Sequence, residues 1–144
     1  MNTNQLTELM NNYECFKGVY PIDLIENLNF NERPIAIIIN LDPSHLPGSH
    51  WVSLFIDQNN IAEYFDSFGF PNFSKELLKL LRNHNIRKII FNKYMLQSTD
   101  SSSCGAYCVM FLKMRCRSFS LNEFLKLFSN RTSQNDLMAL KILE

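Results

Sequence analysis

The chain has 144 residues, 46% of them hydrophobic and 19% charged, so we expect a single domain over residues 1–144 with one well-packed core. Twelve Phe against only four Gly and five Pro exclude a disordered or collagen-like chain, and every apolar run is shorter than the roughly 20 residues of a membrane span. Residues 1–12 lack the basic head and apolar middle of a signal peptide, so the sequence predicts a protein of the cell interior that makes no membrane contact.

The net charge of zero hides two oppositely charged halves. Residues 1–74 carry two basic and nine acidic side chains, whereas residues 75–144 carry twelve basic and five acidic ones. The simplest interpretation is that the two halves of one fold attract each other, and we expect a monomer. The alternative is a basic surface that binds nucleic acid or another polyanion, built from Lys75, Lys79, Arg82, Arg87, Lys88 and Lys93.

The first elements along the chain are helical, and a strand follows them. Apolar side chains recur at helical spacing over residues 3–10, which predicts a short helix capped by Thr3 or Asn4. Residues 22–28 predict a helical turn. Residues 35–39 form a β-branched run that is apolar on both faces, as in an interior strand covered on two sides.

A predicted hairpin and a helix come next. Two Pro and one Gly make residues 42–49 a loop, and residues 50–57 and 61–66 predict antiparallel strands joined by a turn at residues 58–60. Ser74 then begins a helix with Leu side chains toward the core.

The last part of the chain is mainly helical. Residues 86–91 and 94–97 look extended, and a polar loop at residues 98–103 leads into the most apolar segment, residues 104–117, which predicts a buried central helix. Two closing helices are predicted from the capping-box spacings Ser120 with Glu123 and Ser133 with Asp136. Helices at both ends and a mostly antiparallel sheet in the middle indicate an α+β fold.

Cys104 is the candidate nucleophile among four cysteines. It follows the polar loop and begins the apolar helix, where unpaired backbone N–H groups and the helix dipole stabilise a thiolate. Gly105 beside it would let a substrate backbone approach the sulfur. Cys108 and Cys116 fit the role of buried structural residues, and nothing distinguishes Cys15. With no CxxC pair and no zinc spacing, we expect four free thiols in a reducing compartment and no metal.

His50 is the candidate base for that nucleophile. His84 ends a basic helix, where a positive charge is favourable, and His45 lies in a Pro-flanked loop. His50 instead begins a strand, so its ring is held on a rigid element. Taken alone, however, a histidine at the end of a strand is more often structural than catalytic.

Asp66 and Gln97 complete the candidate site. The predicted hairpin brings the start of the strand at His50 beside the end of the strand at Asp66, so the carboxylate can orient the imidazole. Glu63 points to the opposite face, and Asp57 lies near the turn. Gln97 precedes the polar loop, and its amide with the backbone N–H of Cys104 could hold an oxyanion.

The order His, acid, Gln, Cys resembles the adenovirus-type maturation protease (adenain) family. The similar blocks are Gly48-Ser49-His50-Trp51, Tyr64-Phe65-Asp66-Ser67-Phe68-Gly69-Phe70 and Gln97-Ser98-Thr99-Asp100-Ser101-Ser102-Ser103-Cys104-Gly105, within a similarity over roughly residues 13–118. The resemblance implies a papain-like cysteine peptidase fold with permuted chain order. It also implies that His50 is the general base, Asp66 its orienting residue, Gln97 the oxyanion donor and Cys104 the nucleophile.

The family implies a virus-encoded or virus-derived endopeptidase that cleaves virion and capsid precursors near Gly-containing sites, in the virion or in the cytoplasm or nucleus of the host. This chain departs from the adenovirus enzymes in carrying Asp66 where they have Glu, as the related ubiquitin-like-protein proteases also do. Residues 75–103 contain no Cys, so an activating peptide could not be tethered there by a disulfide. The chain is also shorter and neutral, which weakens the expectation that DNA stimulates it, and no other cofactor is expected.

Three other functions share these residues or this fold. A protease or isopeptidase for ubiquitin-like modifiers would use the same four residues and would also cleave after Gly. Acyl transfer through Cys104 would acetylate a partner without cleaving peptides. A capsid or host-interaction module would keep the fold without turnover, although all four candidate residues are present.

Overall fold

The computed structural model describes residues 1–45, 50–141 and 143, and its centre is one five-stranded sheet. The strands lie in the order β1 (Phe16–Pro21), β2 (Ile35–Asn40), β3 (Trp51–Ile56), β4 (Ile61–Phe65) and β5 (Lys88–Phe91). The pairs β2–β3 and β3–β4 are antiparallel, whereas β1 and β5 run parallel to their neighbours. The sheet is therefore mixed. The expectation of a mostly antiparallel sheet is wrong at both edges, because each edge strand is joined to its neighbour by a helical crossover.

The helices are α1 (Thr3–Met10), the 3₁₀ helix η1 (Ile22–Asn27), α2 (Lys75–Asn83), α3 (Cys104–Cys116), α4 (Leu121–Leu125) and α5 (Thr132–Lys141). All six correspond to predicted helical segments. The predicted hairpin is confirmed as β3–β4, and so is the interior strand β2. The α+β class is thus confirmed, while β1 was not predicted and residues 94–97 do not form a strand.

The helix caps differ in part from the sequence interpretation. Asn2, rather than Thr3 or Asn4, caps α1 and forms a reciprocal capping box with Gln5. The predicted box at Ser120 and Glu123 is confirmed. The box predicted at Ser133 and Asp136 is wrong, because Ser133 lies inside α5 and the buried Asp136 carboxylate accepts hydrogen bonds from outside the helix.

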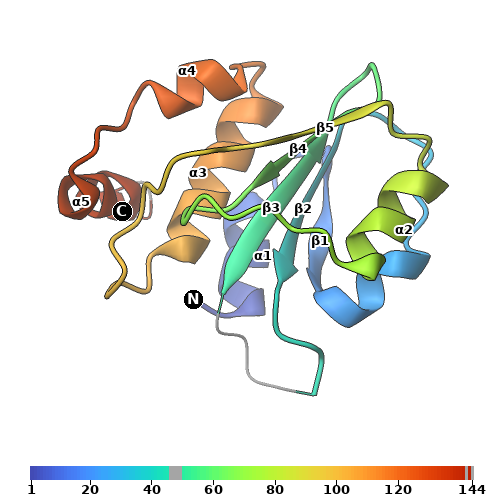
Figure 1. The fold of residues 1–144 in the computed structure, drawn as a ribbon, viewed down its shortest axis with the longest axis horizontal. Coiled ribbons are helices and arrows are strands. Elements are labelled where there is room, and N and C mark those ends of the chain that lie inside the picture. The colour runs from blue at the N-terminus through green and yellow to red at the C-terminus, as the bar shows by residue number, and fades with distance from the viewer. Residues whose placement is uncertain (46–49, 142, 144) are drawn as a thin grey trace.

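Helices cover both faces of the sheet (Figure 1). On one face, α1 and α3 belong to a core cluster with side chains that include Ala36, Ile38 and Phe55, and α4 and α5 pack against α3. On the other face, η1 and α2 pack against side chains that include Ile37 and Leu54. Successive side chains of β2 and β3 thus point alternately to one covered face and to the other. This explains why a run that is apolar on both faces forms an interior strand.

The buried central helix predicted at residues 104–117 is confirmed as α3, whose first nine residues are all buried. Its first residue, Cys104, contacts Trp51 at the start of β3, and its last turn reaches the start of β1. There Cys116 forms a disulfide with Cys15, with the two Cα atoms 6.7 Å apart. The expectation of four free thiols is therefore wrong for this pair. The two residues are far apart in sequence, and only the packing of α3 against the start of β1 brings them together.

One predicted loop and one block of the family resemblance fall partly on residues 46–49. Residues 46–49, which include part of the predicted loop at residues 42–49 and the Gly48-Ser49 part of the resemblance, lie outside the described residues. None of the helices in the described part of the chain has the length and apolarity that a bilayer crossing needs.

Candidate active site

The β3–β4 hairpin brings His50 and Asp66 together. His50 directly precedes β3 and Asp66 directly follows β4, and in an antiparallel pair these two ends are adjacent. Nε2 of His50 lies 2.9 Å from Oδ1 of Asp66. The Asp66 side chain is almost fully buried, at 3% exposure, while that of His50 keeps 18%. The pair thus lies at the surface end of the hairpin, with the acid inside and part of the ring open.

The Asp66 carboxylate and backbone are both fixed by neighbours. Oδ1 also accepts a hydrogen bond from the N–H of Phe68 at 2.8 Å. Asn92 accepts from the N–H of Asp66 at 2.9 Å and donates from Nδ2 to its carbonyl at 2.6 Å. The ring of Phe68 stacks on the His50 ring, with centroids 5.0 Å apart. These contacts hold the imidazole against rotation away from the carboxylate.

The sequence interpretation missed Asn92, although a signal was present. Asn92 is the first polar residue after the apolar strand β5, which runs parallel to β4. The carboxyl ends of parallel neighbours meet at one edge of a sheet, so a side chain there lies near Asp66. The parallel pairing was not recognised, although the helix predicted from Ser74 lies between the strand at residues 61–66 and the extended segment at residues 86–91, as in a crossover connection.

Cys104 lies beside His50 at the first residue of α3. Its side chain is buried, and the backbone N–H of Trp51 donates to its Sγ at 3.5 Å. Burial alone would raise the pKa of the Cys104 thiol, but hydrogen bonds with the His50 side chain and from the N–H groups of Trp51 and Gly105 lower it overall. The Cys104 sulfur at the helix start therefore has three donors. The His50 imidazole and the N–H of the helix were expected from the sequence, and the N–H of Trp51 was not.

The imidazole has the complementary shift. Burial alone would lower the pKa of His50, but its hydrogen bonds with Asp66 and Cys104, and the negative charge of both partners, raise the pKa to about 9. A thiol with a lowered pKa beside an imidazole with a raised one favours a thiolate–imidazolium pair near neutral pH. Such a pair is an activated nucleophile with its proton donor already in place.

Gln97 is buried and connected to this site through its neighbours. Its Oε1 accepts from the hydroxyl of Ser67, the residue after Asp66, at 2.5 Å. Its Nε2 donates to the carbonyl of Ser101 at 2.9 Å and to the hydroxyl of Ser101 at 3.0 Å. The amide thus joins the end of β4 to the loop before Cys104, and in this state its protons are directed to Ser101.

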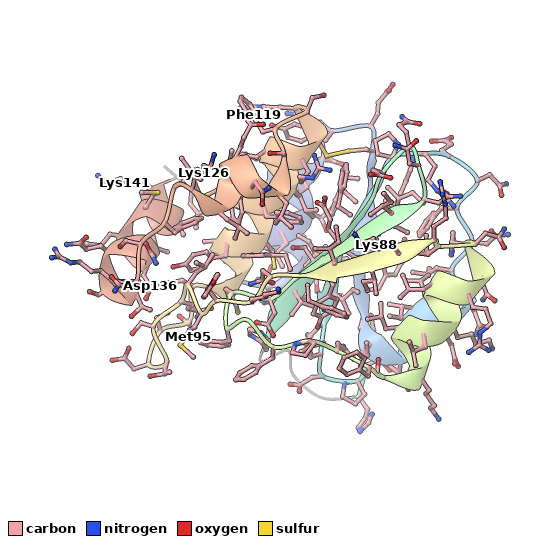
Figure 2. The ribbon with its side chains drawn as sticks, turned by 45° about the horizontal axis from the view of Figure 1, so that its top comes forward. Lys88, Met95, Phe119, Lys126, Asp136 and Lys141 are labelled. Atoms are coloured by element: carbon pink, nitrogen blue, oxygen red, sulfur yellow. A yellow bond between two sulfur atoms is a disulfide. The ribbon has the colours of Figure 1, made fainter. Side chains whose placement is uncertain are left out.

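The polar loop before Cys104 is anchored to α5. Asp136 accepts from the N–H of Ser98 at 3.3 Å and from the hydroxyl of Tyr107 at 2.8 Å. The amide of Asn135 donates to the carbonyl of Leu96 at 3.1 Å. Figure 2 shows Asp136 on α5, beside the segment that carries Met95. The closing helix therefore holds the backbone on both sides of Gln97, at Leu96 and at Ser98.

One expectation for the nucleophile needs correction. Gly105 was expected to leave room for a substrate backbone, but a side chain there would meet the sulfur of Met1 at 3.2 Å and a methyl carbon of Leu6 at 3.3 Å. The carbonyl of Met1 also accepts from the indole N–H of Trp51 at 3.1 Å. The lack of a side chain at Gly105 therefore lets the N-terminal segment pack against α3.

The competing acids and bases lie elsewhere. Glu63 points to the opposite face of the sheet, as predicted, and pairs with Arg115 at 2.7 Å. Asp57 accepts hydrogen bonds from the turn residues of the hairpin. His84 is not a solvated charge at a helix end, because it is buried, with Nδ1 2.8 Å from the Leu80 carbonyl and Nε2 accepting from the N–H of Phe30. His45 is exposed in its loop.

The remaining cysteines are structural. Cys108 lies one turn below Cys104 and is fully buried, and this burial raises its thiol pKa well above the usual range. Among the described residues, no group of three or more His, Cys, Asp or Glu side chains could hold a metal ion.

Known proteins resemble this chain in sequence and in fold. No protein-family model matches it. A protein of Acanthamoeba polyphaga mimivirus named as a thiol protease is 28% identical, and the match covers 95% of this chain and 53% of that protein. A cysteine protease of African swine fever virus is 26% identical over 61% of this chain and 36% of its own length. The chain thus spans about half, or less, of the curated relatives that it matches.

Solved structures share the architecture. The crystal structure of the African swine fever virus protease superposes with a TM-score of 0.66 at 16% identity, over 93% of this chain and 61% of that one. The SUMO protease Ulp1 superposes with a TM-score of 0.55 at 17% identity, over 100% of this chain and 79% of that one. The sequence relatives are viral thiol and cysteine proteases, and the fold is that of this wider group of cysteine proteases rather than of adenain in particular.

Proposed function

We propose that the chain is a virus-encoded or virus-derived cysteine endopeptidase, with the permuted papain-like chain order, that cleaves virion and capsid precursors near Gly-containing sites. The observation that carries the proposal is the contact of His50 with Asp66 beside the buried thiol of Cys104. The similarity to viral proteins named as thiol and cysteine proteases supports it.

In this proposal the Cys104 thiolate attacks the carbonyl carbon of the scissile peptide bond. The tetrahedral intermediate then collapses as the protonated His50 gives its proton to the leaving amine, and an acyl thioester remains on Cys104. Neutral His50 next takes a proton from water, whose oxygen attacks the thioester and releases the acid product. Asp66 stabilises the imidazolium throughout and does not itself take the proton.

Gln97 is the proposed side-chain donor to the oxyanion, together with the backbone N–H of Cys104. Because the Gln97 amide donates to Ser101 in the present state, the proposal requires one amide proton to turn from Ser101 to the substrate oxygen. Loss of one such donor typically costs about 10²–10³-fold in kcat.

Removal of ubiquitin-like modifiers is the second candidate. The superposition on the SUMO protease Ulp1 over the whole chain favours this candidate. Modifier removal and precursor cleavage would use the same kind of site. A role as an inactive capsid or host-interaction module is less favoured, since it does not need the paired pKa shifts of His50 and Cys104. Acyl transfer would use the same activated thiol and differs in its product, an acetylated partner with no peptide cleaved.

The proposed setting is the virion and the host cytoplasm or nucleus, with the chain acting as a monomer on viral precursor polypeptides. All six residues of the proposed basic surface are exposed on or near α2 and β5, namely Lys75, Lys79, Arg82, Arg87, Lys88 and Lys93. If they bind nucleic acid, affinity will fall steeply with added salt. An activating peptide would have to bind without a disulfide tether.

The test combines labelling with substrate choice. A peptide aldehyde ending in Gly should label Cys104 in the unmodified protein and fail to label the His50→Ala variant, as read by mass spectrometry of peptides. Purified capsid precursor and a ubiquitin-like modifier conjugate are then offered separately. Cleavage of the precursor supports the proposal, and cleavage of only the conjugate favours the second candidate. Labelling of Cys104 that is unchanged in the His50→Ala variant would reject both the endopeptidase and the modifier protease.

A further inference from the structure

A hollow of about 510 Å³ opens directly beside the His50–Asp66 pair, on the η1 and α2 side of the sheet. Its walls are mostly apolar and come from Ile22, Leu41, Tyr64 and the loop at residues 68–74. The hollow is large enough for a side chain, and His50 and Asp66 form part of its wall. The chemistry proposed above does not use it.

The loop exposes two aromatic rings toward this hollow. Phe70 is 62% exposed and Phe73 is 70% exposed, and both line it. Leaving two large apolar side chains in water is unfavourable, at about 25 cal/mol for each Å² that could be buried. Their place in a concave wall, rather than scattered over the surface, points to an apolar ligand.

The loop is held rigidly enough to form a defined pocket. The Asn72 side chain donates to the hydroxyl of Tyr64 at 3.2 Å and accepts from the N–H of Ser74 at 2.8 Å. Gly69 has a φ of 77° and lies so close to Tyr94 that an added side chain would meet its carbonyl carbon at 2.9 Å. A positive φ and this close approach both require glycine, so the turn that directs Phe70 outward is fixed.

The chemistry of His50 decides which part of a substrate reaches the hollow. The imidazolium gives its proton to the leaving amine, so the polypeptide on the amine side of the scissile bond must pass over the ring. His50 and Asp66 form one wall of the hollow, whereas Cys104 and Gln97 do not. The hollow therefore lies where residues on the amine side of the bond would be.

The charges of the wall select among apolar ligands. Apart from His50, the charged side chains that line the hollow are the carboxylates of Asp66 and Glu76. Glu76 belongs to the first turn of α2 and is only partly buried, so its carboxylate can reach a ligand at the rim. An aromatic or large aliphatic side chain next to Lys or Arg complements this surface better than one next to Glu.

The geometry points to this hollow as a specificity pocket for residues on the amine side of the scissile bond. The pocket takes one aromatic or large aliphatic side chain flanked by a basic residue. This inference rests on the proposed endopeptidase function and adds the residues that select its substrate. Phe70 and Phe73 bind the apolar side chain, and Glu76 favours the basic neighbour.

A binding experiment tests the pocket without turnover. The Cys104→Ala protein is titrated with hexapeptides that have a free amino terminus, in which Phe followed by Lys occupies the first, second or third position, and with matched peptides that have Ala for Phe. We expect one Phe peptide to bind at least about 10-fold more tightly than its Ala match, since burying a Phe side chain contributes about 1.5–3 kcal/mol. Phe70→Ala and Phe73→Ala, each made in the Cys104→Ala protein, should remove most of this advantage.

The control is Phe119→Ala, which truncates another exposed aromatic ring, 44% exposed and lying after α3 away from α2 (Figure 2). It should leave the Phe advantage intact. Peptides with Glu in place of this Lys are titrated alongside, and Glu76→Gln should reduce the preference for the Lys peptides over them. Equal binding of Phe and Ala peptides, or a Phe advantage that survives in both loop variants, would overturn the pocket.

Turnover separates this inference from the proposed function. If the unmodified protein cleaves quenched peptides with no preference for Phe on the amine side, the endopeptidase stands and the pocket is rejected. If Phe peptides bind through Phe70 and Phe73 but no peptide is cleaved and Cys104 labelling is indifferent to His50, the pocket stands and the endopeptidase is rejected.

Discussion

The two nitrogens of the His50 ring have different partners, and this division determines what the ring can do. Nε2 contacts Asp66 at 2.9 Å, and we therefore assign the interaction with Cys104, which raises the His50 pKa, to the other nitrogen, Nδ1. A ring whose far nitrogen donates to a carboxylate presents the nitrogen that accepts a proton to the nucleophile. Asp66 therefore acts by orientation and by charge, and Asn92 acts one step further out by holding the backbone of Asp66.

Replacing Asp66 by Asn separates these two effects. The amide keeps the size of the side chain but removes the Asp66 charge, which together with the contact to Cys104 raises the pKa of His50 to about 9. Because imidazolium is lost as pH rises through this pKa, the alkaline limb of the kcat profile should move to lower pH. We also expect kcat to fall by about 10²–10⁴-fold. Asp57→Asn at the hairpin turn is the control, and an alkaline limb that stays in place in Asp66→Asn would reject the role of the carboxylate.

Helix α5 positions part of the candidate site, although it lies far from Gln97 in the sequence. Its buried Asp136 and Asn135 bind the backbone on both sides of Gln97, and Tyr107 on α3 shares Asp136. A helix that closes the fold therefore also sets the path of the loop between Gln97 and Cys104. Loss of these contacts should loosen the loop without touching His50.

Asp136→Asn tests this connection. The Tyr107 hydroxyl and the Ser98 N–H both donate to Oδ1, and the Ser98 N–H also reaches Oδ2 at 3.4 Å. The amide therefore removes the negative charge that strengthens both hydrogen bonds and replaces the second acceptor oxygen of Ser98 by a donor. We expect the free energy of unfolding to fall by about 1–3 kcal/mol. We also expect kcat to fall while His50-dependent alkylation of Cys104 persists. Asp100→Asn is the matched control, because that carboxylate is exposed in the same loop. Equal effects of the two substitutions on kcat would argue against the connection.

Over the whole molecule, the Cys15–Cys116 disulfide is a crosslink between distant parts of the chain. The two residues are 101 positions apart, so the bond restricts most of the unfolded chain. It joins the start of β1 to the end of α3, and the opposite end of α3 carries Cys104. We therefore expect it to contribute to global stability while the geometry of the nucleophile is set by local contacts.

Removing this bond should lower stability far more than activity. In Cys116→Ser we expect the free energy of unfolding to fall by about 2–4 kcal/mol in chemical denaturation, with kcat within about twofold. Dithiothreitol should produce the same loss in the unmodified protein and no further loss in the variant. If the reductant leaves the denaturation midpoint of the unmodified protein unchanged, the two cysteines are not paired in solution, and the expectation of free thiols would hold.

The sequence predicted those parts of the molecule that depend on local or periodic patterns. The two-residue period of strands distinguished Asp66 from Glu63, and the run of apolar residues after Cys104 predicted the buried helix. Contacts between distant segments were missed, namely the disulfide, the Asn92 brace and the anchoring of Ser98 to Asp136. No local pattern marks the disulfide or the Ser98 contact, because each residue involved has an ordinary neighbourhood in the sequence, whereas Asn92 could have been found as the first polar residue after an apolar strand. The role of His84 was misjudged for the same reason, since its partner Phe30 lies just after η1 and far from His84 in the sequence.

His50 activates Cys104 in the proposed site, and the pH dependence of Cys104 alkylation is the decisive measurement of this activation. Iodoacetamide is applied to the oxidised protein, in which Cys108 is an internal reference whose buried thiol should react slowly. In the unmodified protein the rate at Cys104 should already be high near pH 7 and should show a further inflection at about pH 9, where His50 loses its proton. In His50→Ala the rate near pH 7 should fall and should rise only toward the pH of an ordinary thiol. Identical profiles for the two proteins would contradict the account.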